Sequence, residues 1–573
     1  MTSATSPTEN TDPAAGLDIA DAPFSRSCHW LSLALRPETG RSVLYLRTAR
    51  GNVVHRTLLR IDVEEENATL KFSPGAMKLV CPAGEAEFAL TGTGTLRARL
   101  RGDLTLRLQV VDQPYSSSFE CEPGRWHINL NASRSRLMIT RLMGDLSVVA
   151  PVIPGKGDTE PALIRIHSTS ENEAELEITE FESTWLAPHD RPPFGEIATE
   201  ANAEFEDWLA AFGSFPSRWK SLARRAAFVL WANTAPAGGN YIYPAILMSR
   251  NAMISVWSWD HCFSALALAQ AHPREAWEQW WLPFALQTPQ GMLPDTFTES
   301  GRDFGMTKPP VHGWALLHLL PHLTLSDEQL GLAYSALENW PSWWFTHRDD
   351  DNDGIPQYNH GCESGWDNDS ICTNGLPCEA PDLSVYLIQQ YDALAELAIR
   401  LQNPEKAAHW QRKANSLWQR LQAHSWRNGR WHALQSGSHR TAREGDCLRL
   451  FWPLLLGQRL DATQRKNLLA GLTEPGRFRT AHGFATEAIN SPSYQADGYW
   501  LGPIWAPSTF QVVEMLRLND CPDEADRVVR EFCELCRRHG FAENFDALTG
   551  TALRDRGYSW TAAVCLCFLK EIL

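Results

Sequence analysis

The sequence predicts an antiparallel β-sandwich domain over residues 23–190 and an (α/α)6 toroid, a double ring of helices, over residues 215–573. Three observations lead to this fold class: short strand-like segments before residue 190, about twelve helical stretches after residue 200, and an uneven distribution of tryptophan. Of the 24 tryptophans, only Trp30, Trp126 and Trp185 precede residue 200. A chain of 573 residues is long enough to form more than one domain.

The N-terminal region has the pattern of short β-strands. Apolar residues alternate in part with polar ones, and Gly, Pro, Asn or Asp separate the segments, which is typical of a sandwich of antiparallel sheets. The predicted strands include Ser42–Leu46, Val53–Leu59, Ala68–Phe72, Glu87–Leu90, Thr95–Leu100 and Leu104–Val110. We expect a linker over residues 191–214, because the segment PHDRPPFGE, Pro188–Glu196, holds three prolines and a glycine.

The C-terminal region has helical periodicity. In the stretch 382–401, apolar residues recur in steps of three and four, which places them on one helical face; they are Leu383, Leu387, Tyr391, Leu394, Ala398 and Leu401. Similar stretches are expected near 217–234, 257–271, 274–287, 311–322, 326–346, 404–423, 447–457, 462–471, 504–518, 522–539 and 558–572. Helices in pairs fit a double ring. An irregular bundle is the alternative, and the lack of a fixed repeat disfavours a solenoid.

Composition excludes several classes of protein. No apolar run reaches the roughly 18 residues of a membrane helix, and the polar segment 1–22 predicts a disordered tail with no secretory signal. The 13 scattered cysteines are typical of reduced thiols, so we expect a cytoplasmic protein. The net charge of −16 disfavours a nucleic-acid partner. No cofactor, metal site or membrane partner is expected, and the oligomeric state is left open.

Four loops between the helical stretches hold the candidate functional residues, and loops are where function concentrates on a rigid scaffold. The first, VWSWDH at Val256–His261, sets Trp257 and Trp259 beside Asp260. Aromatic planes match the apolar faces of sugar rings, and a carboxylate can bind sugar hydroxyls. The alternative is that these are core tryptophans with a helix-capping aspartate.

The second loop, Pro289–Trp314, contains polar or aromatic groups near tight turns. They are Gln290, Asp295, Lys308, His312 and Trp314. Lys308 precedes two prolines, so its backbone is expected to be extended. Any one of these residues is more often structural than catalytic.

The third loop, His347–Ser370, is rich in acidic residues. Asp349, Asp351 and Asp353, followed by Gly354, match the start of a calcium loop, but His360 stands where the bidentate Glu is expected. A solvated turn is the preferred interpretation. Further along, the residues Glu363, Trp366, Asp367 and Asp369 lie close together. Neighbouring carboxylates repel, which raises at least one pKa and favours a proton donor, whereas the alternative is a surface turn.

The fourth loop, Gly540–Trp560, places Glu543 before the last helical stretch and ends at Trp560. Its residues Arg554, Asp555 and Arg556 are expected to form an ion-pair network. A further aromatic segment, GYWLGPIW at Gly498–Trp505, contains Trp500 and Trp505. Paired carboxylates from distant segments, amid tryptophans and without a nucleotide motif, indicate cleavage of a glycosidic bond, which needs one acid and one opposing carboxylate.

As a set, these motifs resemble the family 63 glycoside hydrolases. The motifs are VWSWDH, LPDTF, KPPVHGW, DGIPQY…ESGWDND, GYWLGPIW and AENFD…TG…DRGYSW, in order over about residues 215–573. The family includes processing α-glucosidases and bacterial hydrolases of glucosyl- and mannosylglycerate, and trehalases of the same (α/α)6 clan are more distantly similar. The resemblance implies an (α/α)6 catalytic domain that hydrolyses an α-linked glucoside or mannoside with inversion.

The resemblance also implies roles for individual residues. The family's SGxD loop aligns with residues 364–367, so Asp367 is implied as the general acid, and Glu543 as the general base that activates water. The carboxyl groups of such a pair stand roughly 6.5–9.5 Å apart. The sugar subsites are implied to include Trp257, Trp259, Asp260, Gln290, Lys308, Trp314, Glu363, Trp366, Trp500, Trp505 and Trp560.

Two departures from the family and two alternatives matter. Leu501 stands where many relatives have Arg, which puts specificity in doubt, and shorter loop insertions predict a more open pocket. A phosphorylase is one alternative, because Arg554 and Arg556 near Glu543 would suit phosphate. A non-catalytic sugar-binding protein is the other, although it would not need both carboxylates.

Overall fold

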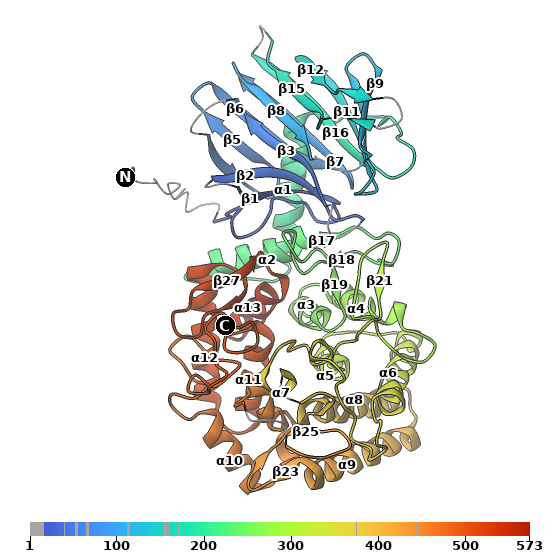
Figure 1. Cartoon of the computed structure of the whole chain (residues 1–573), viewed down its shortest axis with the longest axis vertical. Helices are drawn as coiled ribbons and strands as arrows, with labels where there is room; N and C mark the ends of the chain where they lie inside the picture. Colours follow the sequence, from blue (N-terminus) through green and yellow to red (C-terminus); the bar gives the residue numbers. More distant parts are fainter. Residues whose placement is uncertain are drawn as a thin grey trace. The chain divides into compact units, whose positions relative to one another are not determined.

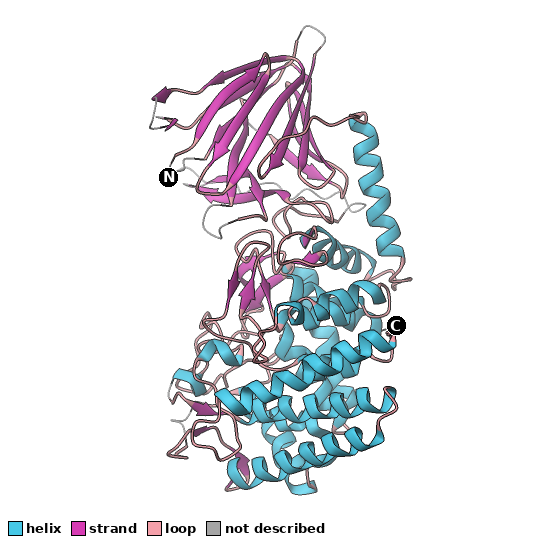
Figure 2. Ribbon diagram, turned by 90° about the vertical axis from the view of Figure 1, so that its right-hand side faces the viewer, coloured by secondary structure: helices cyan, strands magenta, loops and turns pink. Residues whose placement is uncertain are grey.

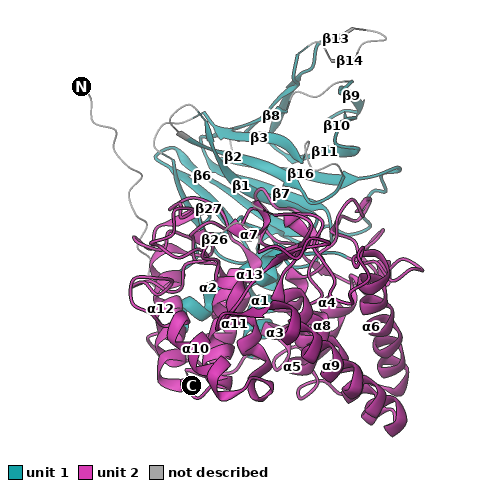
Figure 3. Cartoon of the chain, turned by 60° about the horizontal axis from the view of Figure 1, so that its bottom comes forward, with its two compact units in different colours: residues 1–210, 220–236 teal, residues 211–219, 237–573 magenta. Residues whose placement is uncertain are grey.

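The computed structural model describes residues 16–572 except 39–40, 52–55, 65–67, 112–114, 154–156, 159, 170–171, 374 and 442–444. Most of the expected N-terminal tail lies outside the described residues, but Ile19 and Ala22 within it are buried. The chain divides into two compact units (Figure 3). Unit 1 comprises residues 1–210 and 220–236, and unit 2 comprises residues 211–219 and 237–573.

Unit 1 is a sandwich of two antiparallel sheets, as the sequence predicts, and Figure 2 shows its strands in magenta. The first sheet has the order β1(Leu31–Glu38), β2(Arg41–Thr48), β3(Thr57–Val63), β8(Thr105–Val110), β15(Leu163–His167), β12(Asp145–Val149). The second has the order β4(Thr69–Phe72), β5(Met77–Cys81), β6(Gly84–Thr91), β7(Thr95–Gly102), β16(Glu173–Phe181), β11(Ser135–Met143), β10(Arg125–Leu130), β9(Ser117–Glu122). A short pair, β13(Val152–Ile153) and β14(Gly157–Asp158), lies outside both sheets. In β8, Leu106, Leu108 and Val110 are buried while alternate residues are not, which is the period-two pattern of a half-buried strand.

Two helices belong to the described part of unit 1. Helix α1(Phe194–Ala210) occupies most of the segment expected to be a linker, because Phe194, Ile197, Ala201 and Phe205 recur on one face and are buried. Its first turn packs with Ala89 of β6. The prolines at the start of the segment are typical of a linker and masked this helical spacing. Helix α2(Lys220–Asn233) follows and is buried along most of its length.

Unit 2 is built around a closed ring of six helical segments, which confirms the predicted toroid. Each contacts the next, from α3(Asp260–Leu268) to α5(His312–Leu319), α8(Pro381–Arg400), η3(Leu448–Arg459), α11(Ala506–Leu518), α13(Ser559–Glu571) and back to α3. Figure 1 shows these segments running from green to red along the chain. The inner helices are buried almost all round, as α8 and α13 show. A helix apolar on every side needs neighbours on every side, and the ring supplies them.

Amphipathic helices surround this ring within the described part of unit 2. They are α4(Pro273–Trp281), α6(Asp327–His347), α9(Pro404–Ser425), α10(Ala462–Leu472) and α12(Pro522–His539), and each contacts an inner helix. Helix α12 buries one stripe that includes Val528, Phe532 and Cys536, while its other face carries charges. No helix among the described residues is both long and apolar enough to span a membrane.

Alternation of inner and outer helices determines where the loops meet. Because neighbours in such pairs run antiparallel, successive inner helices start at the same end of the ring. The segments that precede them contain the short elements β19(Val256–Trp257), β20(Thr296–Phe297), η2(Gly361–Ser364), α7(Ser370–Thr373) and β26(Ala542–Phe545), which pairs with β27(Ala552–Arg556). The predicted loops of the sequence therefore gather at one end of the ring.

A buried ion-pair network ties the acidic loop to the inner ring. Arg449 of η3 lies 2.6 Å from Asp369, at the start of α7, and 3.0 Å from Asp382 of α8. The Arg449 and Asp369 side chains have no exposed surface. The Tyr358 hydroxyl also donates to Asp382, at 2.9 Å. Removal of one partner from such a network leaves the others charged and unpaired.

We expect the substitution Arg449→Met to destabilise unit 2 by about 3–5 kcal/mol, because two buried carboxylates lose their cation. The matched control on the same segment is Arg459→Met, since Arg459 pairs with Asp392 at 2.6 Å where both side chains are partly exposed; its loss should cost about 0.2–1 kcal/mol. Urea unfolding followed by tryptophan fluorescence measures both. If the two substitutions lower the free energy of unfolding equally, the buried network contributes no more to stability than a partly exposed ion pair.

Candidate active site

Lys308 is a buried cation that lies among several carboxylates at the end of the ring where the predicted loops gather. Its side chain is 6% exposed, and its ammonium lies 3.0 Å from Asp295 Oδ1 and 3.9 Å from Asp367 Oδ1. It also donates to the carbonyl of Cys362 at 2.9 Å. Burial alone would lower the pKa of Lys308, but Asp367 and Asp295 raise it, so the ammonium stays charged. The extended backbone expected before the two prolines is compatible with this reach across the site.

Asp367 is the most accessible carboxylate of this group. Its side chain is 32% exposed, against 9% for Asp295, and Asp260 is buried. The preceding Gly365 has φ +73°, and a Cβ there would lie 2.8 Å from the ring of Trp259. Only glycine fits that backbone and that contact, which explains why the SGWD segment has it. The segment thus turns sharply and presents Asp367 toward solvent.

Asp260 begins inner helix α3 and has an unusual protonation state. Burial raises its pKa to about 8, despite the attraction of Lys308, and the charges of Asp295 and Asp367 add to the rise. Below that pH the carboxyl is neutral and can donate a hydrogen bond. Its Oδ2 has no hydrogen-bond partner among the described residues. A buried donor without a protein partner is suited to a polar group of a ligand.

Glu543, on β26, is the carboxylate that the resemblance implied as the partner of Asp367. Its side chain is buried. Burial raises its pKa to about 7, while a hydrogen bond with Tyr499 lowers it. The backbone N–H of Asp555 donates to Glu543 Oε2 at 3.5 Å. Strand β26 is joined to the GYWLGPIW segment by a backbone bridge between Phe545 and Ile504. A carboxylate that titrates near neutral pH is suited to proton transfer.

Tyr499, which was not predicted from the sequence, is hydrogen-bonded to Glu543 and lies within electrostatic reach of Asp367 and Asp260. Burial raises the pKa of Tyr499, and the charges of Glu543, Asp367 and Asp260 raise it further, so the phenol stays protonated and donates to Glu543. Its φ of +65° is uncommon for a residue other than glycine. The Arg554 guanidinium lies 4.9 Å from the Tyr499 ring centre and 2.9 Å from Asp497. Backbone strain of this kind often marks a functional site.

Five predicted tryptophans form one aromatic cluster beside these groups. The rings of Trp500 and Trp505 stack with centres 3.9 Å apart, and Trp366 stacks on Trp500 at 4.7 Å. Trp259 and Trp560 meet edge to face at 5.8 Å, and both also contact Trp500. The structure therefore brings together Trp259, Trp366, Trp500, Trp505 and Trp560, as the sequence motifs suggested.

Other predicted residues lie elsewhere or have structural partners. Trp314 is buried and donates to Glu514 on α11, at 2.7 Å. Glu363 is buried in an ion pair with Arg348, at 2.6 Å. Gln290 is exposed in a turn. His312, the first residue of α5, is buried and contacts the carbonyl of Ser258 at 2.9 Å.

Trp257 is half-buried, in β19 opposite Thr296. Leu501, half-buried, lies in the tight turn where its N–H binds the carbonyl of Gly498.

Among the described residues, Arg554, Asp555 and Arg556 form no ion pairs with one another, and Arg554 pairs with Asp497 at 2.9 Å instead. Asp555 instead accepts from Ser249 Oγ at 2.5 Å and from two nearby backbone N–H groups. Arg556 donates to the carbonyl of His539 at 2.6 Å. In a strand, successive side chains point to opposite faces, so three neighbouring charges of β27 do not meet one another.

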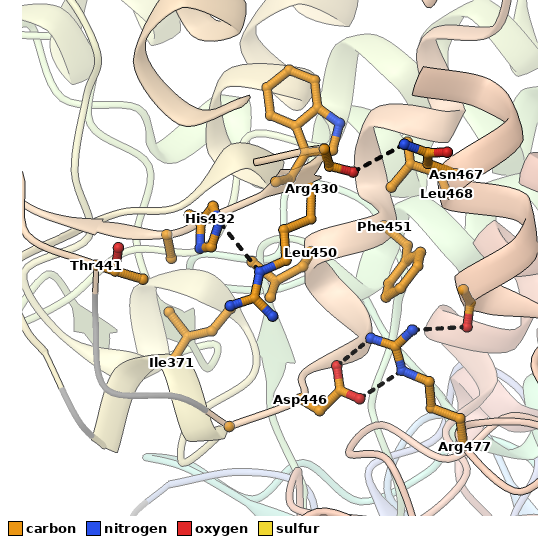
Figure 4. Close-up of a pocket in the computed structure, with 15 residues that line it drawn as sticks. Ile371, Arg430, His432, Thr441, Asp446, Leu450, Phe451, Asn467, Leu468 and Arg477 are labelled. Atoms are coloured by element: carbon orange, nitrogen blue, oxygen red, sulfur yellow. Dashed lines mark hydrogen bonds and ion pairs between the residues drawn. The ribbon is translucent and has the colours of Figure 1, made fainter. Parts of the chain in front are cut away.

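A separate cavity of about 280 Å³ lies away from these residues (Figure 4). Its polar lining includes Arg430, His432, Asp446 and Arg477, and none of the predicted site residues line it. Arg477 binds Asp446 through two hydrogen bonds of 2.6 Å. The charge of Arg477 is thus already balanced within the protein.

The ring of helices, with carboxylates and stacked tryptophans gathered at one end, defines a glycoside hydrolase scaffold of the (α/α)6 type. The profile of the mannosylglycerate hydrolase MGH1-like glycoside hydrolase domain matches residues 253–561. The chain therefore belongs to this family of glycoside hydrolases, which confirms the resemblance to family 63.

Curated relatives are similar over more than half of the chain. A mannosylglycerate hydrolase of Rubrobacter radiotolerans is 24% identical over 407 residues, which is 55% of this chain and 90% of the relative. A glucosylglycerate hydrolase of Mycolicibacterium hassiacum is 23% identical over 453 residues, 61% of this chain and 97% of the relative. The matched relatives are thus covered almost completely.

Solved structures confirm the fold class. The family 63 mannosylglycerate hydrolase of Thermus thermophilus, in complex with Tris and D-glycerate, has a TM-score of 0.52 and 21% identity, and covers 60% of this chain and 99% of its own. A bacterial glucoamylase complexed with acarbose has a TM-score of 0.68 at 10% identity, and covers 100% of this chain and 96% of its own.

We expect Tyr499→Phe to raise the pKa of Glu543, because the carboxylate loses a hydrogen bond that favours its charged form. A hydrogen bond to a charged group contributes about 1.5–3 kcal/mol, so the expected rise in the pKa of Glu543 is about one to two units. The acidic limb of kcat/KM should move to higher pH by that amount. The matched control is Tyr494→Phe, whose hydroxyl has no hydrogen-bond partner among the described residues. An unmoved limb in Tyr499→Phe would show that Glu543 does not control it.

Proposed function

We propose that this chain is an inverting glycoside hydrolase that cleaves an α-glucosidic or α-mannosidic bond in a small glycoside. Asp367 acts as the general acid, which protonates the leaving oxygen, and Glu543 acts as the general base, which takes a proton from the attacking water. The single observation that carries the proposal is the place of Tyr499. Its hydroxyl binds Glu543 and lies within electrostatic reach of Asp367 and Asp260.

The two carboxyls differ in their accessibility and in how firmly they are held. Asp367 is partly exposed beside the ammonium of Lys308, where a substrate oxygen can reach it. Glu543 is buried, and Tyr499 and the Asp555 backbone hold it in one orientation. A fixed base with a pKa of about 7 is ionised in a useful fraction near neutral pH.

The tryptophan cluster of residues 259, 366, 500, 505 and 560, whose rings are all buried, is proposed to support the sugar subsite from behind without stacking on the sugar itself. The neutral carboxyl of Asp260 then donates to a sugar hydroxyl, and this satisfies its unpaired oxygen. The relatives named mannosylglycerate and glucosylglycerate hydrolase make glycerate conjugates the first substrates to test. Leu501, where many family members have Arg, makes the selectivity for the aglycone a question for experiment.

Proton NMR of a fresh reaction tests the stereochemistry and the roles together. With α-glucosides, α-mannosides and their glycerate conjugates, we expect the β-anomer of the free sugar to appear first. Asp367→Asn and Glu543→Gln should each lower kcat by about 10²–10⁴-fold while staying folded. The controls Asp327→Asn and Glu328→Gln, at exposed carboxylates that begin α6, should leave turnover unchanged.

Three results would contradict this proposal. An α-anomer as the first product would exclude inversion, and near-normal turnover in either variant would remove that residue from the mechanism. A strict requirement for phosphate, with a sugar phosphate as product, would favour phosphorolysis, for which Arg554, which packs against Tyr499, is a candidate cation.

The pH dependence gives a separate test. Since the base must be ionised, kcat/KM should fall as pH decreases through about 7, the pKa to which burial raises Glu543. The fall should follow a single proton, with a slope of one on a logarithmic plot. An acidic limb that lies near pH 4 instead would show that another group acts as the base.

A further inference from the structure

A group of two imidazoles and two carboxylates lies in unit 2, outside the candidate active site. It comprises Asp353, Glu379, His424 and His439, one ligand atom of each lying within 4.8 Å of all the others. They come from four segments: the acidic loop, β22(Cys378–Glu379), the end of α9, and the turn after β25(Leu434–Gln435). Strands β22 and β25 pair with each other, which brings these segments together.

The distances within the group have the size expected for ligands of one ion. His424 Nδ1 lies 3.3 Å from Asp353 Oδ2, and His439 Nε2 lies 3.5 Å from the same oxygen and 3.9 Å from Glu379 Oε2. Two ligands at about 2.1 Å from a tetrahedral zinc ion stand about 3.4 Å apart. The other nitrogen of His424 lies 2.8 Å from Glu379 Oε2. This hydrogen bond places the proton of His424 on Nε2, so that Nδ1 keeps its lone pair for an ion.

The buried carboxylate of Glu379 provides an independent indication of a ligand. Its side chain has no exposed surface, and its Oε1 has no hydrogen-bond partner among the residues that the structure describes. An ionised carboxylate oxygen in that position is costly unless a cation or a donor meets it. Hydrogen bonds within the group use only the other oxygen of Glu379.

Charge balance points in the same direction. Asp351 lies 2.9 Å from His439, so three carboxylates, Asp351, Asp353 and Glu379, face two imidazoles. The Arg420 guanidinium nearby donates to the backbone carbonyl of Asp353, at 2.9 Å. Three carboxylates around two imidazoles leave a surplus of negative charge that a divalent cation would offset.

We propose that Asp353, Glu379, His424 and His439 form a binding site for a divalent transition-metal ion of the zinc class. Two imidazoles favour such an ion over calcium or magnesium, which prefer oxygen ligands. This differs from the calcium loop that the sequence suggested, whose carboxylates here accept backbone N–H groups, as Asp349 does from Gly354 at 3.1 Å. No metal was expected from the sequence.

The position of the site indicates a structural role. Asp353 precedes the segment that leads to Asp367, and Tyr358 in that segment pairs with Cys378, the neighbour of Glu379. An ion here would join four separate segments and fix the course of the loop, in the way that metals cross-link irregular structure. It would stabilise the loop without taking part in the hydrolysis.

Metal binding by the full-length chain tests the site without any assay of hydrolysis. The protein is stripped with EDTA, dialysed, and titrated with Zn²⁺ by calorimetry and with Co²⁺ by visible absorption. We expect one Zn²⁺ per chain, a Co²⁺ absorption band in the visible region, and a melting temperature that rises with Zn²⁺. His439→Ala, at a side chain that is 37% exposed, should weaken Zn²⁺ binding at least about tenfold and abolish the Co²⁺ band.

Control variants test whether the bound Zn²⁺ occupies this group of side chains. Glu379→Gln should also lose Zn²⁺ binding. If this variant does not fold, the result for His439→Ala, at a partly exposed side chain, is the test of the proposal. His322→Gln, at an exposed histidine outside the group, should bind as the unchanged chain does. No Zn²⁺ uptake, or uptake that His439→Ala leaves unchanged, would overturn the proposal, and so would binding of Ca²⁺ in preference to Zn²⁺. None of these results depends on whether Asp367 and Glu543 are catalytic.

Discussion

The closure of six helices into a ring is the constraint on which the rest of unit 2 depends. Because α3, α5, α8, η3, α11 and α13 each contact two others in the circle, they leave little surface for polar groups along their length. The chemistry-bearing residues are therefore confined to the segments that enter these helices. Asp260 begins α3, Trp505 precedes α11 and Tyr558 precedes α13. The ring thus determines where a site can form before any residue determines what the site does.

The ammonium of the buried Lys308 reduces the repulsion among the carboxylates at that end of the ring. Asp295 and Asp367 lie beside the ammonium of Lys308, and Asp260 interacts with the same charge. Burial raises the pKa of Asp260 to about 8 despite this cation, so its carboxyl is protonated at neutral pH. The site therefore contains a neutral carboxyl group, that of Asp260, in a position where water would otherwise keep it ionised.

Much of the fold follows from sequence pattern, because its helices obey a simple periodicity. The stripe from Leu383 to Leu401 predicts α8 within one residue at its start, and the other eleven predicted stretches each coincide with a helical segment. Helix α1 was missed because Pro192 and Pro193 suggested a linker, although Phe194, Ile197, Ala201 and Phe205 carry a helical signal.

The site was harder to predict, because side-chain partners depend on tertiary contacts. Trp314 and Glu363 stand in the same kinds of motif as Trp366 and Asp367, yet Glu514 and Arg348 occupy their polar atoms. Tyr499 lies in the segment GYWLG, directly after Gly498 and before Trp500. An aromatic residue next to a glycine turn could have marked it as a candidate site residue. His424 and His439 lie far from Asp353 in sequence, and no spacing rule connects them.

The tryptophan stack has a further consequence for recognition. Trp500 lies between Trp366 and Trp505, and Trp259 and Trp560 border it, so the rings have no room to rotate. The loss of rotational entropy at these side chains is thus incurred when the protein folds, not when a ligand arrives. Because these rings are also buried, the cluster holds the subsite in front of it in one shape, and that subsite cannot adapt to sugars of different contour. It favours ligands that already match its surface, in contrast to a surface of flexible side chains that adapts to many.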